Sequence, residues 1–208
     1  MSLRLVLLRH AETDWNRERR YQGWRDIPLS DTGRGQAEAA GRLLAAEPLA
    51  AVWASPLRRA RDTAAAIATA QGLPVRVADA FREMRFGQWE GLTADEARSR
   101  FPELHRAWAE APHDVALPGA ETLAEVKARA IGGLAELRQA HDGQRVCLVS
   151  HGITCRILIL EALGLGLDRM WSLQLSSTGI SELEFRDDWA AVHRMNTLVH
   201  LERLPAGR

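Results

Sequence analysis

The sequence predicts an α/β fold, namely a three-layer α/β/α sandwich with a mostly parallel central sheet and a small helical lid insertion. Two apolar runs rich in Val and Leu, over 5–8 and 145–149, are typical of strands that are buried on both faces. Strand-like and helix-like segments alternate along the chain, which favours a sheet between two helical layers. The segment from 92 to about 121 differs, because it combines three prolines with scattered charges. We therefore expect a single domain over 1–208, with the lid inserted at about 92–121.

The first half of the chain contains regular elements separated by clear turn and cap signals. A polar stretch over 12–31 follows the first strand and is expected to be a long loop, which in compact domains is usually functional. Ser55 and Pro56 are typical of a helix N-cap and a first helical position. The expected elements are a helix over 33–46 before Pro48, a strand over 51–54, a helix over about 57–70 before Gly72, and a strand over 75–77.

The second half begins with the lid and ends with a pair of strands. Thr93 with Glu96, and Thr122 with Glu125, have the spacing of capping boxes, which mark helix starts. The second box opens a long amphipathic helix, whose expected apolar face consists of Leu123, Val126, Ala130, Leu134 and Leu137. The remaining expected elements are a strand over 145–149, a helix over 154–163, and strands over 180–185 and 190–195 that pair across a turn at 187–188.

The composition excludes several classes of partner. Lys and Arg number 27, as do Asp and Glu, so the net charge is +0 and neither nucleic acid nor an anionic membrane is expected as a partner.

Cys147 and Cys155 lack metal-ligand spacing and are expected to be reduced and buried. The chain shows no signal region and no membrane-spanning run, so we expect a soluble cytoplasmic protein. Seven tryptophans, if some are exposed together, favour a homodimer.

Each of the two buried strands ends at a histidine, His10 or His151. Ligands of open α/β sheets bind at the carboxyl ends of the strands, so the histidines should meet in one crevice if the strands are neighbours. A small residue follows each of them, Ala11 or Gly152, and lets the backbone approach a ligand closely. Metal binding is the rival use of paired histidines. No carboxylate stands at metal-ligand spacing, so neither a metal nor another cofactor is expected.

Arg58 lies in the expected first turn of a helix, where a cation opposes the helix dipole at a cost of about 0.3–1 kcal/mol. An anionic ligand would compensate for this cost. Arg9, Arg58 and the free N–H groups of two helix starts therefore predict a pocket for a tetrahedral dianion such as phosphate, because guanidinium groups match phosphate oxygens in pairs. The alternative is a solvated arginine, which is the role that we expect for Arg59 and Arg61.

A histidine that attacks phosphorus needs an acid that protonates the leaving oxygen. Glu83 is the preferred candidate, because it follows a short strand and precedes an aromatic, glycine-rich turn. Glu12 and Glu90 are alternatives for this acid, and a surface salt bridge is the other interpretation of Glu83. Asn16 and Gln22, in the long loop, are candidate neutral donors to the phosphate.

Four short motifs follow one another along nearly the whole chain. They are Arg9-His10-Ala11-Glu12-Thr13 with Trp15-Asn16, Ser55-Pro56-Leu57-Arg58-Arg59-Ala60 with Thr63-Ala64, Glu83 with Gly87-x-Trp89-Glu90-Gly91, and Ser150-His151-Gly152. Together they resemble the motifs of the histidine phosphatase superfamily, which has the phosphoglycerate-mutase-like fold. The resemblance implies that His10 is the phosphorylated nucleophile and Glu83 the proton donor. It also implies that the residues binding phosphate are Arg9, Arg58 and His151, with further contacts from Asn16 and Gln22.

Within this superfamily the chain is most similar to the phosphatase branch. The mutases usually carry Lys-Arg-Ala in the second motif and Tyr-Gly-Leu after the acidic glutamate, whereas this chain has Leu-Arg-Arg-Ala over 57–60 and Phe-Gly-Gln-Trp-Glu-Gly over 86–91. Broad-specificity phosphatases and α-ribazole-5′-phosphate phosphatases are the nearest likenesses. Ala11 departs from the glycine that is most frequent at this position, which bears only on how closely the backbone approaches phosphate. The resemblance implies a metal-independent phosphomonoesterase that acts on a small soluble phosphate ester.

Two other functions remain open from the residues alone. A 2,3-bisphosphoglycerate-dependent phosphoglycerate mutase needs the same residues but retains the phosphoryl group, and a non-catalytic phospho-ligand-binding module would keep only the pocket. Substrate choice is expected to depend on residues 92–121 and on the loop at 21–24. Arg20, Arg25 and Arg85 are candidates for binding a second anionic group of the substrate, with solvated arginines as the alternative interpretation.

Overall fold

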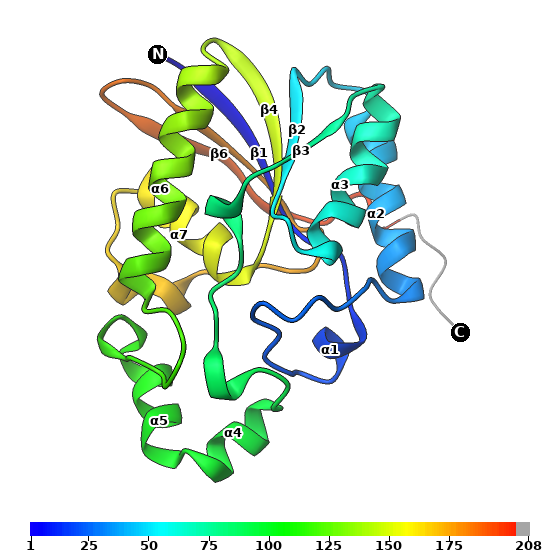
Figure 1. The fold of residues 1–208 in the computed structure, drawn as a ribbon. Coiled ribbons are helices and arrows are strands. Elements are labelled where there is room, and N and C mark those ends of the chain that lie inside the picture. Colours follow the sequence, from blue (N-terminus) through cyan, green and yellow to red (C-terminus); the bar gives the residue numbers. More distant parts are fainter. Residues whose placement is uncertain (203–208) are drawn as a thin grey trace.

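A six-stranded sheet forms the centre of the computed structural model, which describes residues 1–202 (Figure 1). The strands are β1 (Leu3–Arg9), β2 (Ala51–Ala54), β3 (Val75–Val77), β4 (Gln144–Ser150), β5 (Ile180–Phe185) and β6 (Ala190–Thr197). Their order across the sheet is β3-β2-β4-β1-β5-β6. The first four in this order are parallel, whereas β5 is antiparallel to β1 and β6 is antiparallel to β5. The predicted mostly parallel sheet and the pairing of the last two strands are confirmed.

Helices cover both faces of the sheet and complete the predicted three layers (Figure 1). One face carries α2 (Asp31–Leu44) and α3 (Arg58–Gln71), and the other carries α6 (Leu123–Ala140) and α7 (Gly152–Ala162). Val6 and Leu8 of β1 pack in one hydrophobic cluster with α2 and α3, whereas Leu5 and Leu7 pack in another with α6 and α7. Side chains alternate between the faces of a strand, so a strand that is covered on both faces is apolar throughout.

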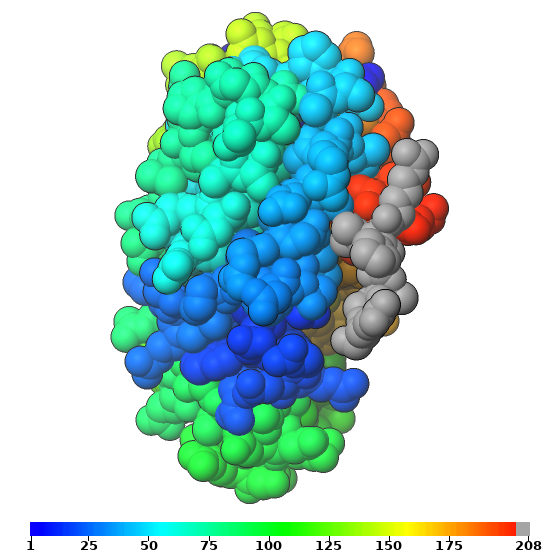
Figure 2. Space-filling view, turned by 90° about the vertical axis from the view of Figure 1, so that its right-hand side faces the viewer, coloured from blue at the N-terminus to red at the C-terminus, as the bar shows by residue number. Residues whose placement is uncertain are grey.

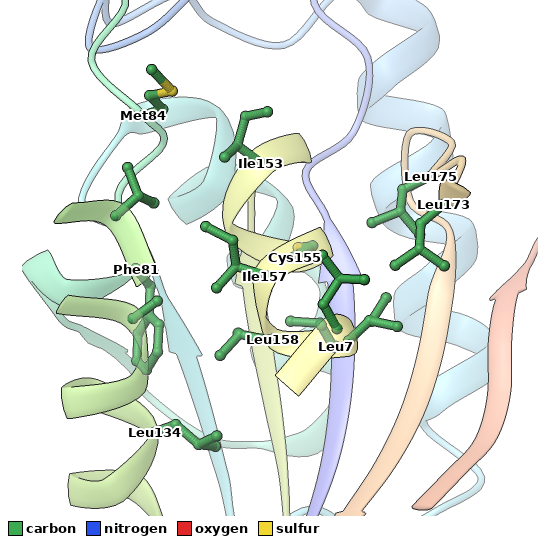
Figure 3. Packing of buried hydrophobic residues seen from close by; sticks show 14 of the residues in the cluster. Leu7, Phe81, Met84, Leu134, Ile153, Cys155, Ile157, Leu158, Leu173 and Leu175 are labelled. Carbon is green, nitrogen blue, oxygen red and sulfur yellow. The ribbon is translucent and has the colours of Figure 1, made fainter. Parts of the chain in front are cut away.

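The cluster under α6 and α7 also anchors the segment that contains Glu83. Figure 3 shows Leu7 of β1, Leu134 of α6 and side chains of α7 from close by. Phe81 at the end of the short 3₁₀ helix η1 (Asp79–Phe81) and Met84 both belong to this cluster and are buried. All five predicted apolar positions of α6 are buried as well. Apolar residues on either side of Glu83 therefore fix its backbone against the core.

The start of α3 differs from the prediction. Leu57 rather than Ser55 is the N-cap, and it makes no side-chain capping bond. The Ser55 hydroxyl instead accepts the Leu57 N–H at 3.3 Å and contacts His151. The N–H of Arg58 in the first turn donates to Asp26 Oδ1 at 2.6 Å. A carboxylate from a distant loop thus replaces the predicted local cap.

Residues 92–121 lie beyond the carboxyl ends of the parallel strands (Figure 1). They contain α4 (Ala94–Arg100), α5 (Pro102–Glu110) and the 3₁₀ helix η3 (Pro112–Asp114). Both predicted capping boxes are present, at the starts of α4 and α6. Figure 2 shows this segment, in green, against the dark-blue loop after β1. The N–H of Tyr21 donates to the carbonyl of Leu92 at 2.9 Å and joins the two.

Five short helical segments within residues 1–202 were not expected from the sequence, and η1 and η3 are two of them. The long loop contains α1 (Asp14–Arg17), which begins with a capping box of Thr13 and Asn16. The 3₁₀ helices η2 (Gly87–Trp89) and η4 (Leu167–Ser172) are the remaining two. None of the helices within residues 1–202 combines the length and the apolar character that crossing a membrane requires.

The two cysteines are free and buried, as predicted. Burial raises the pKa of the Cys147 thiol to about 12, so this thiol stays protonated at neutral pH. Within residues 1–202, His, Cys, Asp and Glu side chains form no group of three or more that could hold a metal ion.

Candidate active site

A cavity of about 240 Å³ lies where β1 and β4 end, next to residues 92–121. The polar residues of its lining are Arg9, His10, Asn16, Arg20, Gln22, Arg59, Glu83 and Arg156. β1 and β4 are neighbours in the sheet, which brings His10 and His151 together as predicted. The cavity therefore combines His10 with an excess of guanidinium groups, whereas His151 is packed against His10 and is absent from the described lining.

His10 is buried in one fixed orientation at the end of β1. The backbone N–H of His10 donates to the carbonyl of Ser150 on the neighbouring strand at 2.8 Å. Nδ1 lies 2.7 Å from the carbonyl oxygen of Ala11, a contact that requires a proton on Nδ1. Nε2 therefore carries the lone pair, and Arg59 Nε donates to it at 3.3 Å. A neutral imidazole with its Nε2 lone pair available is the form that attacks phosphorus.

His151 is fully buried beside His10, with 5.2 Å between the ring centroids. Its Nε2 lies 2.7 Å from Ser55 Oγ, whereas its Nδ1 is buried without a partner in the described part of the chain. A buried unsatisfied nitrogen of this kind indicates a place for a ligand or a water molecule. Burial lowers the pKa of both histidines well below 6.5, and the nearby cations of Arg59 and Arg9 lower it further.

The lowered histidine pKa values predict that stability depends on pH. Below pH 6.5 and above the folded-state pKa values, His10 and His151 bind protons in the unfolded chain but not in the folded chain. The free energy of unfolding should therefore fall as the pH decreases through this window, by up to about 1.4 kcal/mol per pH unit for each histidine. Urea unfolding between about pH 7 and pH 5.5 measures this slope. A His10→Asn/His151→Asn double variant should lose it, and an unchanged slope in that variant would contradict the prediction.

Arg59, rather than Arg58, is the arginine that α3 brings to the cavity. The Arg59 side chain is buried, and its Nη1 and Nη2 donate to the carbonyls of Arg25 and Gly23 at 2.8 Å each. Burial lowers the pKa of Arg59 to about 10, which leaves it charged at neutral pH. Arg58 is exposed to solvent and pairs with Asp62 at 3.3 Å. The predicted positions of Arg58 in the pocket and Arg59 in solvent are therefore wrong.

The register of α3 explains this correction. The buried residues of the helix form one stripe, which consists of Arg59, Ala60, Thr63, Ala64, Ile67 and Ala68. Successive helical residues are about 100° apart, so Arg58 lies outside the stripe. The Thr63 hydroxyl accepts the Ala11 N–H at 3.0 Å and donates to the Arg59 carbonyl at 2.7 Å, which ties this stripe to the residue after His10. The apolar spacing of the helix was the sequence signal that could have identified Arg59.

Arg9 and Arg156 also border the cavity. Arg9 donates through Nη1 to the carbonyl of Leu175 at 2.7 Å, and its Nε is buried without a partner among the described residues. Arg156, which the sequence reasoning missed, donates through Nη1 to the carbonyl of Gly152 at 3.1 Å. Its position one turn after Gly152 on the same helix was the available signal. Among the described lining residues, Glu83 is the single carboxylate opposite these cations.

Glu83 is held by contacts to both its side chain and its backbone. Its Oε1 accepts the Met84 N–H at 2.9 Å, and its two carboxylate oxygens accept the Ile153 N–H at 3.2 and 3.3 Å. Its carbonyl accepts hydrogen bonds from Trp24 Nε1 at 2.8 Å and Arg129 Nη2 at 3.0 Å. The carboxyl group thus lies at the start of α7 and faces the same cavity as His10.

The predicted neutral donors and Gly152 also line the cavity. Gln22 Oε1 is buried and has no partner within residues 1–202. Asn16 Oδ1 is occupied by the N–H and the hydroxyl of Thr13, both at 3.0 Å, so its amide nitrogen is the group that remains for a ligand. A Cβ atom at Gly152 would lie 3.3 Å from Arg156 Nη1, so glycine at this position leaves room between charged groups.

The other candidates from the sequence have different surroundings. Glu12 and Glu90, the alternatives for the acid, are absent from the described lining of the cavity. Of the three arginines considered for a second anion, Arg20 lines the cavity but pairs with two glutamates, whereas Arg25 and Arg85 do not line it.

Known proteins resemble this chain over most of its length. A model of the histidine phosphatase superfamily (branch 1) matches residues 5–198. Phosphoserine phosphatase 1 of Hydrogenobacter thermophilus is 36% identical over 199 residues, which are 96% of this chain and 94% of the relative. Glucosyl-3-phosphoglycerate phosphatase of Mycolicibacterium vanbaalenii is 37% identical over 176 residues, 79% of this chain and 76% of that protein. The solved structure of Bacillus stearothermophilus YhfR has a TM-score of 0.91 at 33% identity and covers 96% of this chain and 99% of its own. The chain therefore belongs to branch 1 of the histidine phosphatase superfamily.

Proposed function

We propose that this protein hydrolyses small phosphate monoesters through a covalent phosphohistidine at His10. The observation that carries the proposal is the neutral His10 imidazole, which lines a cavity bordered by the guanidinium groups of Arg9, Arg59 and Arg156. Such a cavity neutralises the charge of a phosphate dianion, which otherwise repels a nucleophile. The phosphatases among the relatives support the hydrolysis of a phosphate ester.

The first step transfers the phosphoryl group to the protein. His10 Nε2 attacks phosphorus in line, so an N–P bond forms while the bond to the leaving oxygen breaks. Arg59 Nε, which donates to Nε2 in the free protein, donates to a phosphate oxygen instead. Arg9 and His151 stabilise the remaining equatorial oxygens, and Glu83 gives its proton to the departing alkoxide.

The second step releases phosphate. Glu83, now ionised, takes a proton from a water molecule while the water oxygen attacks phosphorus. The N–P bond breaks, its electron pair returns to His10 Nε2, and inorganic phosphate leaves. Glu83 is protonated again at the end of the cycle, so one water molecule is the only reactant besides the ester.

We also propose that residues 92–121 act as a lid on the leaving-group side of the cavity, within a single domain. Trp108 of α5 lines the cavity together with Trp171. The Nε1 of Trp171 donates to the carbonyl of Trp108 at 2.9 Å, which joins the lid to η4. Tyr21 and Phe86 complete an aromatic wall that suits the apolar surface of a leaving alcohol.

For location and assembly, we propose a cytoplasmic protein that acts on soluble small molecules, without nucleic-acid or membrane partners. The balanced charge of the chain supports a small-molecule substrate over a polyanion. The homodimer remains a prediction. Three tryptophans are exposed, and each has an arginine guanidinium over its ring. The distances from the arginine Cζ to the ring centroid are 4.8 Å for Trp24, 5.5 Å for Trp171 and 5.0 Å for Trp189.

Phosphate release from a panel of esters tests the proposed function. The panel contains phosphoserine, 3-phosphoglycerate, α-ribazole phosphate and sugar phosphates, and every assay includes a chelator. We expect stoichiometric release of inorganic phosphate from at least one ester, with no loss of rate in the chelator. Interconversion of 3- and 2-phosphoglycerate after priming with 2,3-bisphosphoglycerate, without phosphate release, would instead show the mutase. Binding of esters without turnover would show the non-catalytic module.

A further inference from the structure

Glu90 lies between two loops that carry groups of the proposed active site. We propose that Glu90 is a positioning residue, which keeps Arg59 and Glu83 in place by accepting hydrogen bonds from the backbone of both loops. The inference rests on the proposed function, because it assigns a task to Glu90 only if those two residues act on a phosphate ester. Glu90 itself is absent from the described lining of the cavity, so it acts through its neighbours.

One carboxylate oxygen of Glu90 makes both loop contacts. Oε1 accepts the N–H of Trp24 at 3.1 Å and the N–H of Phe86, also at 3.1 Å. Oε2 lies 3.5 Å from Arg25 Nε, and the Glu90 side chain is only 10% exposed. Gly23 packs against the same oxygen with φ +50, and a Cβ atom at Gly23 would lie 2.1 Å from Oε1. The carboxylate therefore fills a space that the backbone leaves for it.

The first loop fixes the guanidinium of Arg59. The carbonyls of Gly23 and Arg25, on either side of Trp24, accept the two terminal nitrogens of Arg59 at 2.8 Å each. The third donor of Arg59, Nε, then reaches His10 Nε2. Residues 23–25 belong to no helix or strand and have one turn hydrogen bond, from the Arg25 N–H to the Gln22 carbonyl at 3.0 Å, so contacts such as that of Glu90 contribute to where these two carbonyls lie.

The second loop fixes the carboxyl group of Glu83. The N–H of Phe86 binds Glu90, and the indole Nε1 of Trp24 donates to the carbonyl of Glu83 at 2.8 Å. Trp24 thus connects the two loops through its side chain, while Glu90 connects them through their backbones. A displacement of Glu90 should move the phosphate-binding guanidinium and the acid together.

Two conservative variants of Glu90 distinguish the effect of the position of its accepting oxygen from the effect of its negative charge. Glu90→Gln keeps a carbonyl oxygen at the position of Oε1 but removes the charge, whereas Glu90→Asp keeps the charge but is shorter by one methylene group. If Glu90 acts by accepting the two N–H groups, the Gln variant should stay within about fivefold of the wild-type kcat/KM, because neutral acceptors bind roughly half as strongly as charged ones. The Asp variant should lose about 10- to 100-fold, since small displacements of catalytic groups have effects of this size.

Two readouts distinguish positioning from a general loss of stability. The Kd for inorganic phosphate, measured by calorimetry, reports on Arg59. The ratio of kcat/KM for glycerol phosphate to that for para-nitrophenyl phosphate reports on Glu83, because only the poor alkoxide leaving group needs an acid. In the Glu90→Asp protein we expect weaker phosphate binding and a lower ratio. A variant that is merely less stable would show the wild-type ratio.

Asp142→Ala serves as the matched control. Asp142 Oδ1 accepts the backbone N–H of Ser2 at 2.6 Å, in the turn before β4 and thus at the opposite end of the strands. This variant removes a carboxylate that binds a distant backbone N–H, and it should keep the wild-type Kd and ratio.

Four outcomes decide the inference. Wild-type behaviour of the Gln variant together with the expected loss in the Asp variant supports it. The reverse order of the two variants, or equal rates for wild-type and Glu90→Asp proteins, overturns the inference alone. A wild-type protein that hydrolyses neither these two esters nor any ester of the panel overturns the proposed function, and the inference with it.

Discussion

A His10→Ala variant is expected to lose ester turnover to below about 10⁻⁴ of the wild-type rate. His10 Nε2 is the nucleophilic atom beside Arg59 in the cavity, and alanine has no atom that can accept the phosphoryl group. The variant should also form no acid-labile phosphoprotein with a ³²P-labelled ester, whereas the wild-type protein should become labelled. Phosphate release and labelling after rapid quenching in alkali measure the two effects.

His141→Ala is a suitable control for this experiment. His141 is also buried, and it accepts from Trp53 Nε1 at 3.1 Å and contacts Gln144 at 2.9 Å, just before β4 begins. Its loss should lower the free energy of unfolding but leave turnover and labelling intact. Labelling of folded His10→Ala protein would disprove a covalent intermediate on this residue.

The strands and helices of the three layers could be predicted because the sequence patterns that indicate them lie within short, continuous segments. Continuous apolar runs predicted strands covered on both faces, and β1 confirms this by sending Leu5 and Leu7 to one cluster and Val6 and Leu8 to the other. Capping boxes predicted the starts of α4 and α6, because the side chain and the N–H that it binds are three residues apart. The 3₁₀ helices have no such signal, since one or two turns bury too few residues to show a period.

The site could be predicted where it depends on strand ends and could not where it depends on contacts between loops. His10 and His151 come together because β1 and β4 are adjacent in the sheet, and strand ends are visible in the sequence. The start of α3 depends instead on Asp26, which binds the N–H of Arg58 from a different loop. The rule that favours Ser55 as N-cap was correct as a propensity, and the tertiary contact overrode it.

Arg59 lines the cavity in place of the predicted Arg58, so the second large loss of activity is expected on substitution of Arg59. Arg59→Ala should lower kcat/KM by about 10²- to 10³-fold, a loss typical of one donor to the transition state, because the Arg59 guanidinium donates to His10 Nε2 in the cavity. Arg59→Lys should recover little of this loss, since the single nitrogen of an ammonium group cannot occupy the three positions from which Nε, Nη1 and Nη2 of the guanidinium reach the imidazole and the two carbonyls. Arg58→Ala should stay close to wild type, because Arg58 is exposed and its pair with Asp62 is a surface ion pair.

Titration of His10 provides a second test that does not depend on catalysis. The Arg59 cation lowers the pKa of His10 in addition to the larger effect of burial, so the pKa should rise in the Arg59→Ala protein and stay unchanged in the Arg58→Ala protein. Imidazole resonances followed by NMR across the acidic range would measure both shifts. A loss of activity in the Arg58→Ala protein with normal activity in the Arg59→Ala protein would mean that α3 presents the other arginine to the phosphate, and would require a different register for its first turn.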